Sequence, residues 1–193
     1  MRISVDPSFH HVFCKLRFRS TKSITKAIDC IAEHSGQGLK EDTEKPDKLS
    51  TDVIGVMPKI MDLGGINDAY PKVNRAKYLV LVNALNKIKM NLDEEGRRDV
   101  VLLHDRFISS TVKEKVCDFA RKANWQTFPT SDFTGSETDT VIFVGPGGLE
   151  PLSRARLRLY VVLMWDTEKG KKKYERYLPG FKRAISEKLM TTP

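Results

Sequence analysis

The feature that most constrains the fold is a pair of continuous apolar runs in the last third of the chain. Residues 141–144 read Val-Ile-Phe-Val, and residues 159–165 read Leu-Tyr-Val-Val-Leu-Met-Trp. A strand with one face in water alternates apolar and polar residues, whereas a continuous run indicates a strand that is covered on both faces. Such strands are typical of parallel sheets with helices on either side, so the runs predict an α/β fold.

Helix and strand patterns alternate along the rest of the chain, as expected where crossover helices connect parallel strands. The strands that we expect span residues 53–57, 100–103, 127–128, 140–144 and 157–164. The expected helices span residues 20–33, 73–92, 111–120, 149–156 and 171–189, the last of them basic. Together these elements predict a mostly parallel sheet flanked by helices.

Local patterns support some of these boundaries. Thr111 and Glu114 have the spacing of a capping box, which would begin the third helix. The Gly64-Gly65 pair predicts a loop after the first strand. One apolar stripe at helical spacing supports the helix at 73–92, and its members are Leu81, Leu85, Ile88 and Leu92.

Length and composition favour one domain over residues 1–193, because 193 residues with 40% hydrophobic content can bury one substantial core. Residues 35–50 are polar and charged and contain Gly and Pro, so we interpret them as a surface loop or a small disordered insertion within that domain. Three cysteines are too few for a disulfide framework, and no apolar run reaches the length of a membrane span. We therefore expect an intracellular protein, nuclear or cytoplasmic, with no membrane partner.

The chain is basic, with 33 Lys and Arg against 25 Asp and Glu, a formal net charge of +8 and a pI of about 9.4. A surplus of this size favours approach to a phosphate backbone. The solvated surface of an ordinary soluble protein can carry a similar charge, so the grouping of the charges matters more than their sum.

Three segments carry residues suited to chemistry. In residues 16–21, Arg19 precedes a helix start, where the helix dipole opposes a positive charge and an anion would offset the cost. Residues 130–139 offer a glycine, hydroxyls and carboxylates before a strand. Residues 149–156 contain Arg154 and Arg156, and arginine binds phosphate through two parallel hydrogen bonds. Each segment also has a plain structural interpretation: an exposed arginine, a polar turn and a solvated helix face.

Taken in order, the three segments resemble motifs IV, V and VI of superfamily 1 helicases. Arg19 and the serine after it match the Arg-Ser pair of motif IV. Residues 135–137, Gly-Ser-Glu, match the Gly-x-Glu of motif V, and residues 153–155, Ser-Arg-Ala, match motif VI. The resemblance extends from about residue 14 to residue 165. It implies a RecA-like fold of the P-loop NTPase class, in the position of the second motor domain.

The resemblance also implies roles for particular residues. Arg154 and Arg19 would reach the γ-phosphate of ATP held by a preceding RecA-like domain, with Arg154 as an arginine finger. Glu137 would lie near the ribose, with Gly135 and Arg156 completing the nucleotide contacts.

In the same enzymes the motif V loop touches the nucleic-acid backbone, so Thr134 and Ser136 are candidates to contact single-stranded DNA or RNA. Thr134 also departs from the family pattern, which has Gln or Lys before the glycine in many members. Motif VI follows motif V unusually closely, after the linker 145–148, Gly-Pro-Gly-Gly.

The larger departure is an absence from the sequence. The chain has no Gly-x-x-x-x-Gly-Lys-Ser/Thr phosphate loop and no acidic pair at a strand end to hold Mg²⁺. We therefore expect no hydrolysis by the chain alone, with Mg²⁺ supplied by the other domain, whether this chain is part of a longer motor or a stand-alone relic.

Two alternatives remain open. A non-catalytic nucleic-acid-binding or regulatory module predicts that Arg19, Glu137 and Arg154 do not converge. A different Rossmann-like nucleotide-binding domain would use residues 145–148 as an anion site, with their amides directed into an open pocket. Residues 171–177, three lysines followed by Tyr-Glu-Arg-Tyr, could also meet a phosphate backbone. The histidines and cysteines lack metal-ligand spacing, so we expect no metal site of their own.

Overall fold

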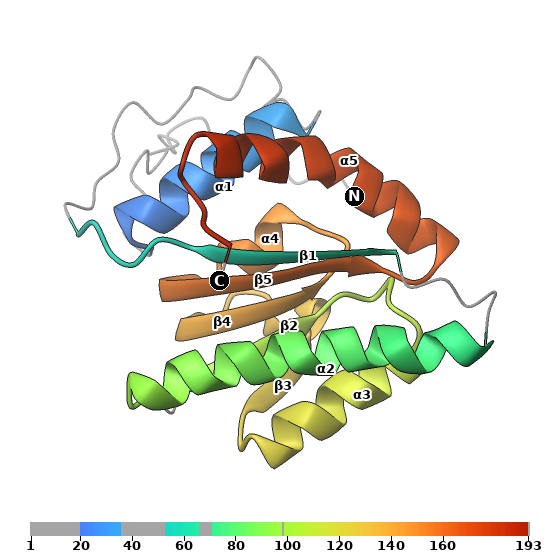
Figure 1. The fold of residues 1–193 in the computed structure, drawn as a ribbon. Helices are drawn as coiled ribbons and strands as arrows, with labels where there is room; N and C mark the ends of the chain where they lie inside the picture. Colours follow the sequence, from blue (N-terminus) through green and yellow to red (C-terminus); the bar gives the residue numbers. More distant parts are fainter. Residues whose placement is uncertain (1–19, 36–52, 66–70, 98, 193) are drawn as a thin grey trace, which may run out of the picture.

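The computed structural model describes residues 20–35, 53–65, 71–97 and 99–192, in which a parallel sheet lies between two layers of helices (Figure 1). Every strand pairing is parallel, and the five strands follow the order β1-β5-β4-β2-β3. The strands are β1 (Lys59–Gly65), β2 (Val100–His104), β3 (Gln126–Pro129), β4 (Thr138–Gly145) and β5 (Ala155–Trp165). The α/β class and the mostly parallel sheet expected from the sequence are confirmed.

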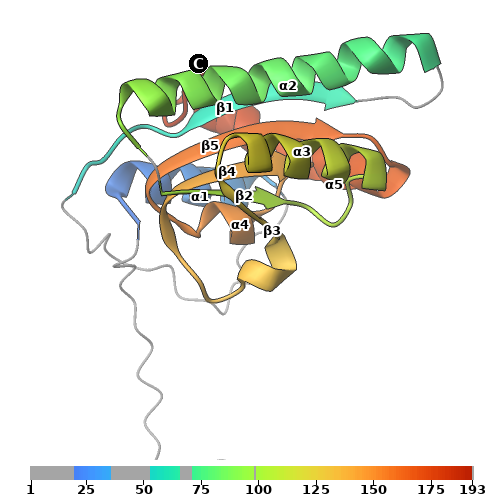
Figure 2. The same ribbon diagram turned by 90° about the horizontal axis from the view of Figure 1, so that it is seen from below.

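The helices divide between the two faces of this sheet, as Figures 1 and 2 show. One face is covered by α1 and α5, with the short α4 beside α1, and the other by α2 and α3. The helices are α1 (Lys22–His34), α2 (Pro71–Glu94), α3 (Ser110–Lys122), α4 (Leu149–Leu152) and α5 (Glu168–Ser186), with the 3₁₀ helix η1 (Thr130–Phe133).

The two apolar runs form the central strands, and each contributes side chains to both cores. In β4, Phe143 packs on the α1/α5 side while Ile142 packs on the α2/α3 side. In β5, Val161 and Val162 divide in the same way. Successive side chains of a strand point to opposite faces, so a strand between two helix layers must be apolar at every position.

The strand expected at Val53–Met57 is wrong. These residues lie outside the sheet and are exposed, and β1 begins only at Lys59, after the buried Pro58. The carbonyls of Val53 and Ile54 accept hydrogen bonds from the first amides of α1, which prevents them from joining the sheet ladder. The expected Gly-Gly loop is instead the end of β1.

Two helix starts also differ from expectation. The N-cap of α3 is Ser109, whose hydroxyl accepts from the amide of Val112 at 3.3 Å, so the predicted capping box from Thr111 is wrong. The last helix begins earlier than expected, because the Thr167 hydroxyl accepts from the amide of Gly170 at 3.0 Å.

The helix expected at 149–156 is shorter than predicted. The α4 helix ends at Leu152, because β5 already begins at Ala155 opposite Thr138. The remaining expected helices and strands agree with the structure to within a few residues. The polar segment at 35–50 falls outside the described residues beyond its first position. Of the helices that the structure describes, none is long and apolar enough to cross a membrane.

An ion pair joins α5 to the carboxyl edge of the sheet. Asp105 follows β2 and is only 2% exposed. Its Oδ2 accepts from Nζ of Lys173 on α5 at 2.6 Å, and its Oδ1 accepts from the amide of Phe107 at 2.8 Å. A buried carboxylate without partners is costly, so this lysine holds α5 over the end of β2.

We expect Lys173→Met to lower the free energy of unfolding by about 2 kcal/mol, because the buried carboxylate keeps only its backbone donor. The matched control is Lys172→Met, which removes an exposed lysine from the same turn and should change stability by less than about 0.5 kcal/mol. Urea denaturation of the two variants measures the difference. Equal midpoints would show that the pair contributes nothing.

Candidate functional site

Segments that are far apart in the sequence meet at the amino edge of the sheet, where β4 and β5 begin. The hydroxyl of Ser20, just before α1, donates to the carbonyl of Ala155 at 2.6 Å. The amide of Thr138, at the start of β4, donates to the carbonyl of Arg154 at 3.1 Å. The start of α1, the loop before β4 and the segment before β5 are therefore in direct contact with one another.

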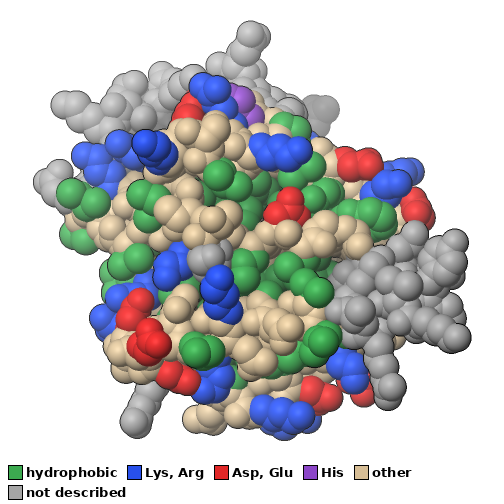
Figure 3. Space-filling model, in the orientation of Figure 1, with side chains coloured by type: hydrophobic (Ala, Val, Ile, Leu, Met, Phe, Trp, Pro, Cys, Tyr) green, Lys and Arg blue, Asp and Glu red, His purple; other side chains and the backbone are tan. Residues whose placement is uncertain are grey.

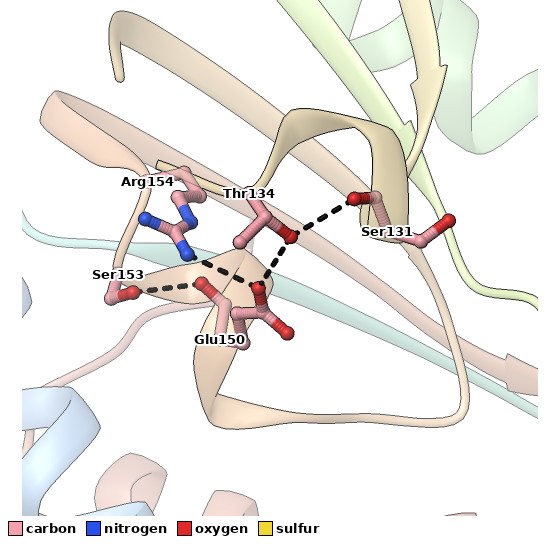
Figure 4. A network of polar contacts seen from close by, with 5 residues as sticks. All are labelled: Ser131, Thr134, Glu150, Ser153 and Arg154. Atoms are coloured by element: carbon pink, nitrogen blue, oxygen red, sulfur yellow. Dashed lines mark hydrogen bonds and ion pairs between the residues drawn. The ribbon is translucent and has the colours of Figure 1, made fainter. Parts of the chain in front are cut away.

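Arg154 is held by a polar network at this edge (Figure 4). Its guanidinium donates to Oε1 of Glu150, four residues earlier, at 3.1 Å. The Thr134 hydroxyl lies 3.1 Å from the same carboxylate oxygen and 2.9 Å from the carbonyl of Ser131, and donates its single proton to one of them. The Ser153 hydroxyl donates to the carbonyl of Glu150 at 2.8 Å. The loop before β4 and the segment before β5 thus share one carboxylate.

The contact between Arg154 and Glu150 orients the guanidinium without holding it tightly. The arginine side chain is 15% exposed, but that of Glu150 is 54% exposed. Ion pairs with such access to water contribute about 0.2–1 kcal/mol. A phosphate that accepts two charge-assisted hydrogen bonds from a guanidinium offers a stronger interaction, so an incoming anion can draw Arg154 away from Glu150.

Arg156 lies beside this network at the start of β5. Its side chain is 57% exposed and its Nε is 3.5 Å from Oδ1 of Asp139, while its carbonyl accepts from the amide of Thr21 at 3.0 Å. Arg158, the next arginine, pairs with Glu95 at 2.8 Å beyond the end of α2 and connects the sheet to that helix. Of these two arginines, Arg156 is the one accessible to a ligand.

The remaining predicted residues lie in the loop before β4. Thr134, Gly135 and Ser136 are exposed, and Gly135 has φ +83°, a left-handed conformation that favours glycine. Glu137 is half-buried and engaged in an interaction of its own. Arg19 lies outside the described residues, immediately before the Ser20 contact.

These residues lie at the edge opposite to the one that parallel sheets commonly use. Ligands of open α/β sheets bind outside the carboxyl ends of the strands, in the loops that follow them. Arg154 and Thr134 instead precede β5 and β4. An arginine at the amino edge of the sheet cannot reach a ligand bound at the carboxyl edge of the same sheet. It can contact a ligand that is bound to another domain.

The glycine linker at 145–148 does not form the open anion site that one alternative requires. All four residues are buried. A Cβ at Gly147 would come within 2.8 Å of the Tyr177 side chain, and one at Gly145 within 2.6 Å of that of Asp105. The linker is glycine-rich because α5 and the end of β2 pack closely against it, which removes the observation on which the alternative depended.

The basic start of α5 also lacks the surface expected of a nucleic-acid platform. Tyr174 and Tyr177 are buried in the core on the α1/α5 side, and Lys173 is engaged with Asp105. The Tyr174 hydroxyl donates to the Asp62 carboxylate at 2.8 Å, and burial together with this bond raises its pKa. Bases stack on exposed aromatic rings, so this helix face offers them no stacking site.

Glu150 is the site residue that sequence reasoning missed. The spacing of Glu150 and Arg154 at i and i+4 was a usable signal, because such pairs meet on a helix. It was overlooked because the residue falls just outside the motif VI match. Among the described residues, no group of three or more His, Cys, Asp or Glu side chains could hold a metal ion.

The residues present fit the outer side of a bound polyphosphate. Arg154 and Arg156 place two guanidinium groups at one edge, and these match phosphate in charge and in hydrogen-bond geometry. The sequence has no loop that could cradle the phosphates from the other side. The two guanidinium groups can therefore contact an anion from one side.

The sheet order and helix layers are those of an α/β domain consistent with the RecA-like fold. Among solved structures, the chain is similar to the C-terminal domain of a possible DNA helicase from Lactobacillus plantarum WCFS1. The TM-score is 0.53 at 15% sequence identity, over 91% of this chain and 98% of that one. At this identity the likeness shows the fold. The sequence matches no protein-family model and no curated protein.

His104 provides a test of the core beside the carboxyl edge. It is 3% exposed, its Nδ1 has no hydrogen-bond partner, and burial followed by the charge of Lys113 lowers its pKa. The unfolded chain then binds a proton more readily than the folded one. Stability should therefore fall as the pH drops below about 6.5 toward the lowered pKa.

We expect the free energy of unfolding of the wild-type chain to decrease between pH 7.5 and pH 5.5, and His104→Leu to flatten this dependence. Urea denaturation at both pH values measures the slope, with the variant and the wild type compared at each pH. An unchanged slope in the variant would show that His104 does not titrate in this range.

Proposed function

We propose that this chain acts as the second motor domain of a superfamily 1 helicase-like ATPase. In this proposal it supplies arginines to an ATP site that a preceding RecA-like domain completes, and it contacts single-stranded nucleic acid. The observation that carries the proposal is the meeting of the segments around Ser20, Thr138 and Arg154 at one edge of the sheet. Support also comes from the fold, which is similar to that of a possible helicase C-terminal domain.

Arg154 is the arginine finger of the proposed site. Its guanidinium would donate hydrogen bonds to the oxygens of the γ-phosphate and stabilise the negative charge that develops there. Glu150 and Thr134 orient the arginine before the nucleotide arrives. Bound ATP with Mg²⁺, which the preceding domain would hold, supplies the transferred phosphoryl group. Arg156 adds positive charge at the same edge, and Arg19 is a second candidate that rests on the sequence alone.

The loop before β4 would contact both the nucleotide and the nucleic acid. The Thr134 and Ser136 hydroxyls are exposed and suited to donate to backbone phosphates, while Glu137 would accept hydrogen bonds from the ribose. The positive φ of Gly135 makes a turn between Thr134 and Ser136. One loop could in this way couple nucleotide binding to the grip on a single strand.

The second candidate function is a non-catalytic nucleic-acid-binding or regulatory module derived from a helicase. The absence of a phosphate loop from the sequence favours it. The two candidates differ in what the chain does when it is joined to the sequence encoded upstream. A motor half gains ATP hydrolysis stimulated by single strands, whereas a module binds nucleic acid without hydrolysis in either form.

In a two-domain enzyme that contains this chain, we expect Arg154→Ala to reduce kcat for ATP hydrolysis by roughly 10³-fold or more. Arg154→Lys should recover little, because an ammonium lacks the planar fork of a guanidinium. Steady-state ATPase assays with and without single-stranded DNA or RNA measure the effect.

The matched control is Arg121→Ala, which removes an arginine that is 78% exposed on α3, on the other face of the sheet. This variant should retain full activity. Thermal unfolding should show both alanine variants folded, since neither arginine belongs to the core. Retention of activity by Arg154→Ala would remove this residue from the mechanism.

A further inference from the structure

An exposed apolar segment leads into β1 at the amino edge of the sheet. Val53 is 60% exposed, Ile54 71%, Val56 41% and Met57 39%. In Figure 3 apolar side chains gather beneath basic ones on the left of the molecule, the side on which this segment enters β1 in Figure 1. Contiguous exposed apolar side chains rimmed by charge are typical of interaction sites.

A pocket of about 320 Å³ opens on this surface. Among the described residues, its apolar lining consists of the aliphatic side chains of Ile54 and Leu189 and the thioether of Met57, with no aromatic ring. The volume is at the lower end of the range of about 300–1,000 Å³ for small ligand pockets, which suits one or two side chains.

Three lysines surround the apolar lining: Lys22 and Lys26 from α1, and Lys188 from the end of α5. No acidic side chain of the described residues lines the pocket, and none of the ion pairs that the structure describes involves these lysines. Lys22 and Lys26 are four residues apart on one helix, where like charges repel. An anionic partner would relieve this repulsion.

Lys188 is held in a conformation that lysine rarely adopts. It has φ +56°, in the C-terminal position where glycine usually ends a helix. The amide of Leu189 donates to the carbonyl of Ala184 at 2.8 Å, and that of Lys188 donates to Ile185 at 3.0 Å, which is the hydrogen-bond pattern of a Schellman motif. A lysine in this left-handed conformation lowers the stability of the fold relative to a glycine. It also adds a third positive charge to the rim of the pocket.

The pocket is preformed, because backbone contacts fix the segments around it. The amides of Lys22 and Ser23 donate to the carbonyls of Val53 and Ile54 at 2.9 and 3.1 Å. The amide of Thr191 donates to the carbonyl of Pro58 at 3.0 Å and so anchors the segment after α5 next to β1. Because these α1 amides are already hydrogen-bonded, an anion in the pocket would have to be bound by the lysine side chains.

We propose that this pocket binds an acidic peptide segment of a partner protein, with an aliphatic side chain in the pocket and carboxylates against Lys22, Lys26 and Lys188. An aliphatic lining favours a leucine-like side chain, while the lysine rim matches flanking Asp or Glu. Single-stranded nucleic acid would share the attraction to the lysines, but its bases stack on aromatic rings, and the part of the lining that the structure describes has none.

The test measures fluorescence anisotropy of a labelled peptide with two leucines between pairs of glutamates, titrated with the full chain. We expect micromolar binding that weakens with salt. The double charge reversal Lys22→Glu with Lys26→Glu should weaken it at least tenfold, and Ile54→Ser at least threefold. The double reversal Lys115→Glu with Lys122→Glu on α3 changes the net charge equally and should leave binding unchanged.

Two further probes distinguish binding of the leucine side chains from binding of negative charge alone. A peptide with serines in place of the leucines should bind at least threefold more weakly. A labelled oligothymidylate should bind equally well to the Lys22/Lys26 variant and to the Lys115/Lys122 variant. Thermal unfolding should show all variants folded, because the replaced side chains lie on the surface. Equal binding of both peptides, equal losses in the two charge-reversed chains, or oligothymidylate binding that depends on Lys22 and Lys26 would each overturn the proposal.

Discussion

The pairing of β4 with β5 is the constraint on which the rest of the structure depends. The two strands pair from Thr138 opposite Ala155 to Gly145 opposite Leu163, with one register shift between Thr138 and Thr140, and both helix layers cover them. Their buried backbone must be paired within the sheet, and their side chains must be apolar on both faces. The segments that carry Thr134 and Arg154 lead directly into these strands, so the pairing that forms the core also fixes the candidate site.

Strands buried on both faces could be predicted, whereas the edge strand could not. The sequence at 53–57 is more apolar than that of β1, yet it is β1 that joins the described sheet, at its edge and paired with β5. Hydropathy measures the preference of a segment for burial. It does not show which other elements of the fold pack against that segment. Residues 53–57 stay out of the sheet because the first amides of α1 donate hydrogen bonds to the carbonyls of Val53 and Ile54.

The residue types and order of the candidate site could be predicted, but not its contacts. Arg154 and Gly135 stand out because few residues provide a planar cation or a left-handed turn. The shared carboxylate of Glu150 depends on a side chain that reaches the preceding loop. The three lysines of the pocket come from α1 and from the end of α5, so no sequence spacing joins them.

The start of α1 connects the two surfaces of the amino edge. Ser20 and Thr21 donate to the first residues of β5, while Lys22 and Ser23 donate to the segment before β1. With these amides occupied, the positive end of the helix contributes little direct hydrogen bonding to an anion. Recognition of negative charge must then come from side chains, and these differ on the two sides. The guanidinium groups near β5 suit the fixed geometry of phosphate, whereas the flexible ammonium groups around the pocket suit carboxylates in varied positions. In the two proposals, one rigid helix start therefore supports two anion-binding surfaces of different specificity.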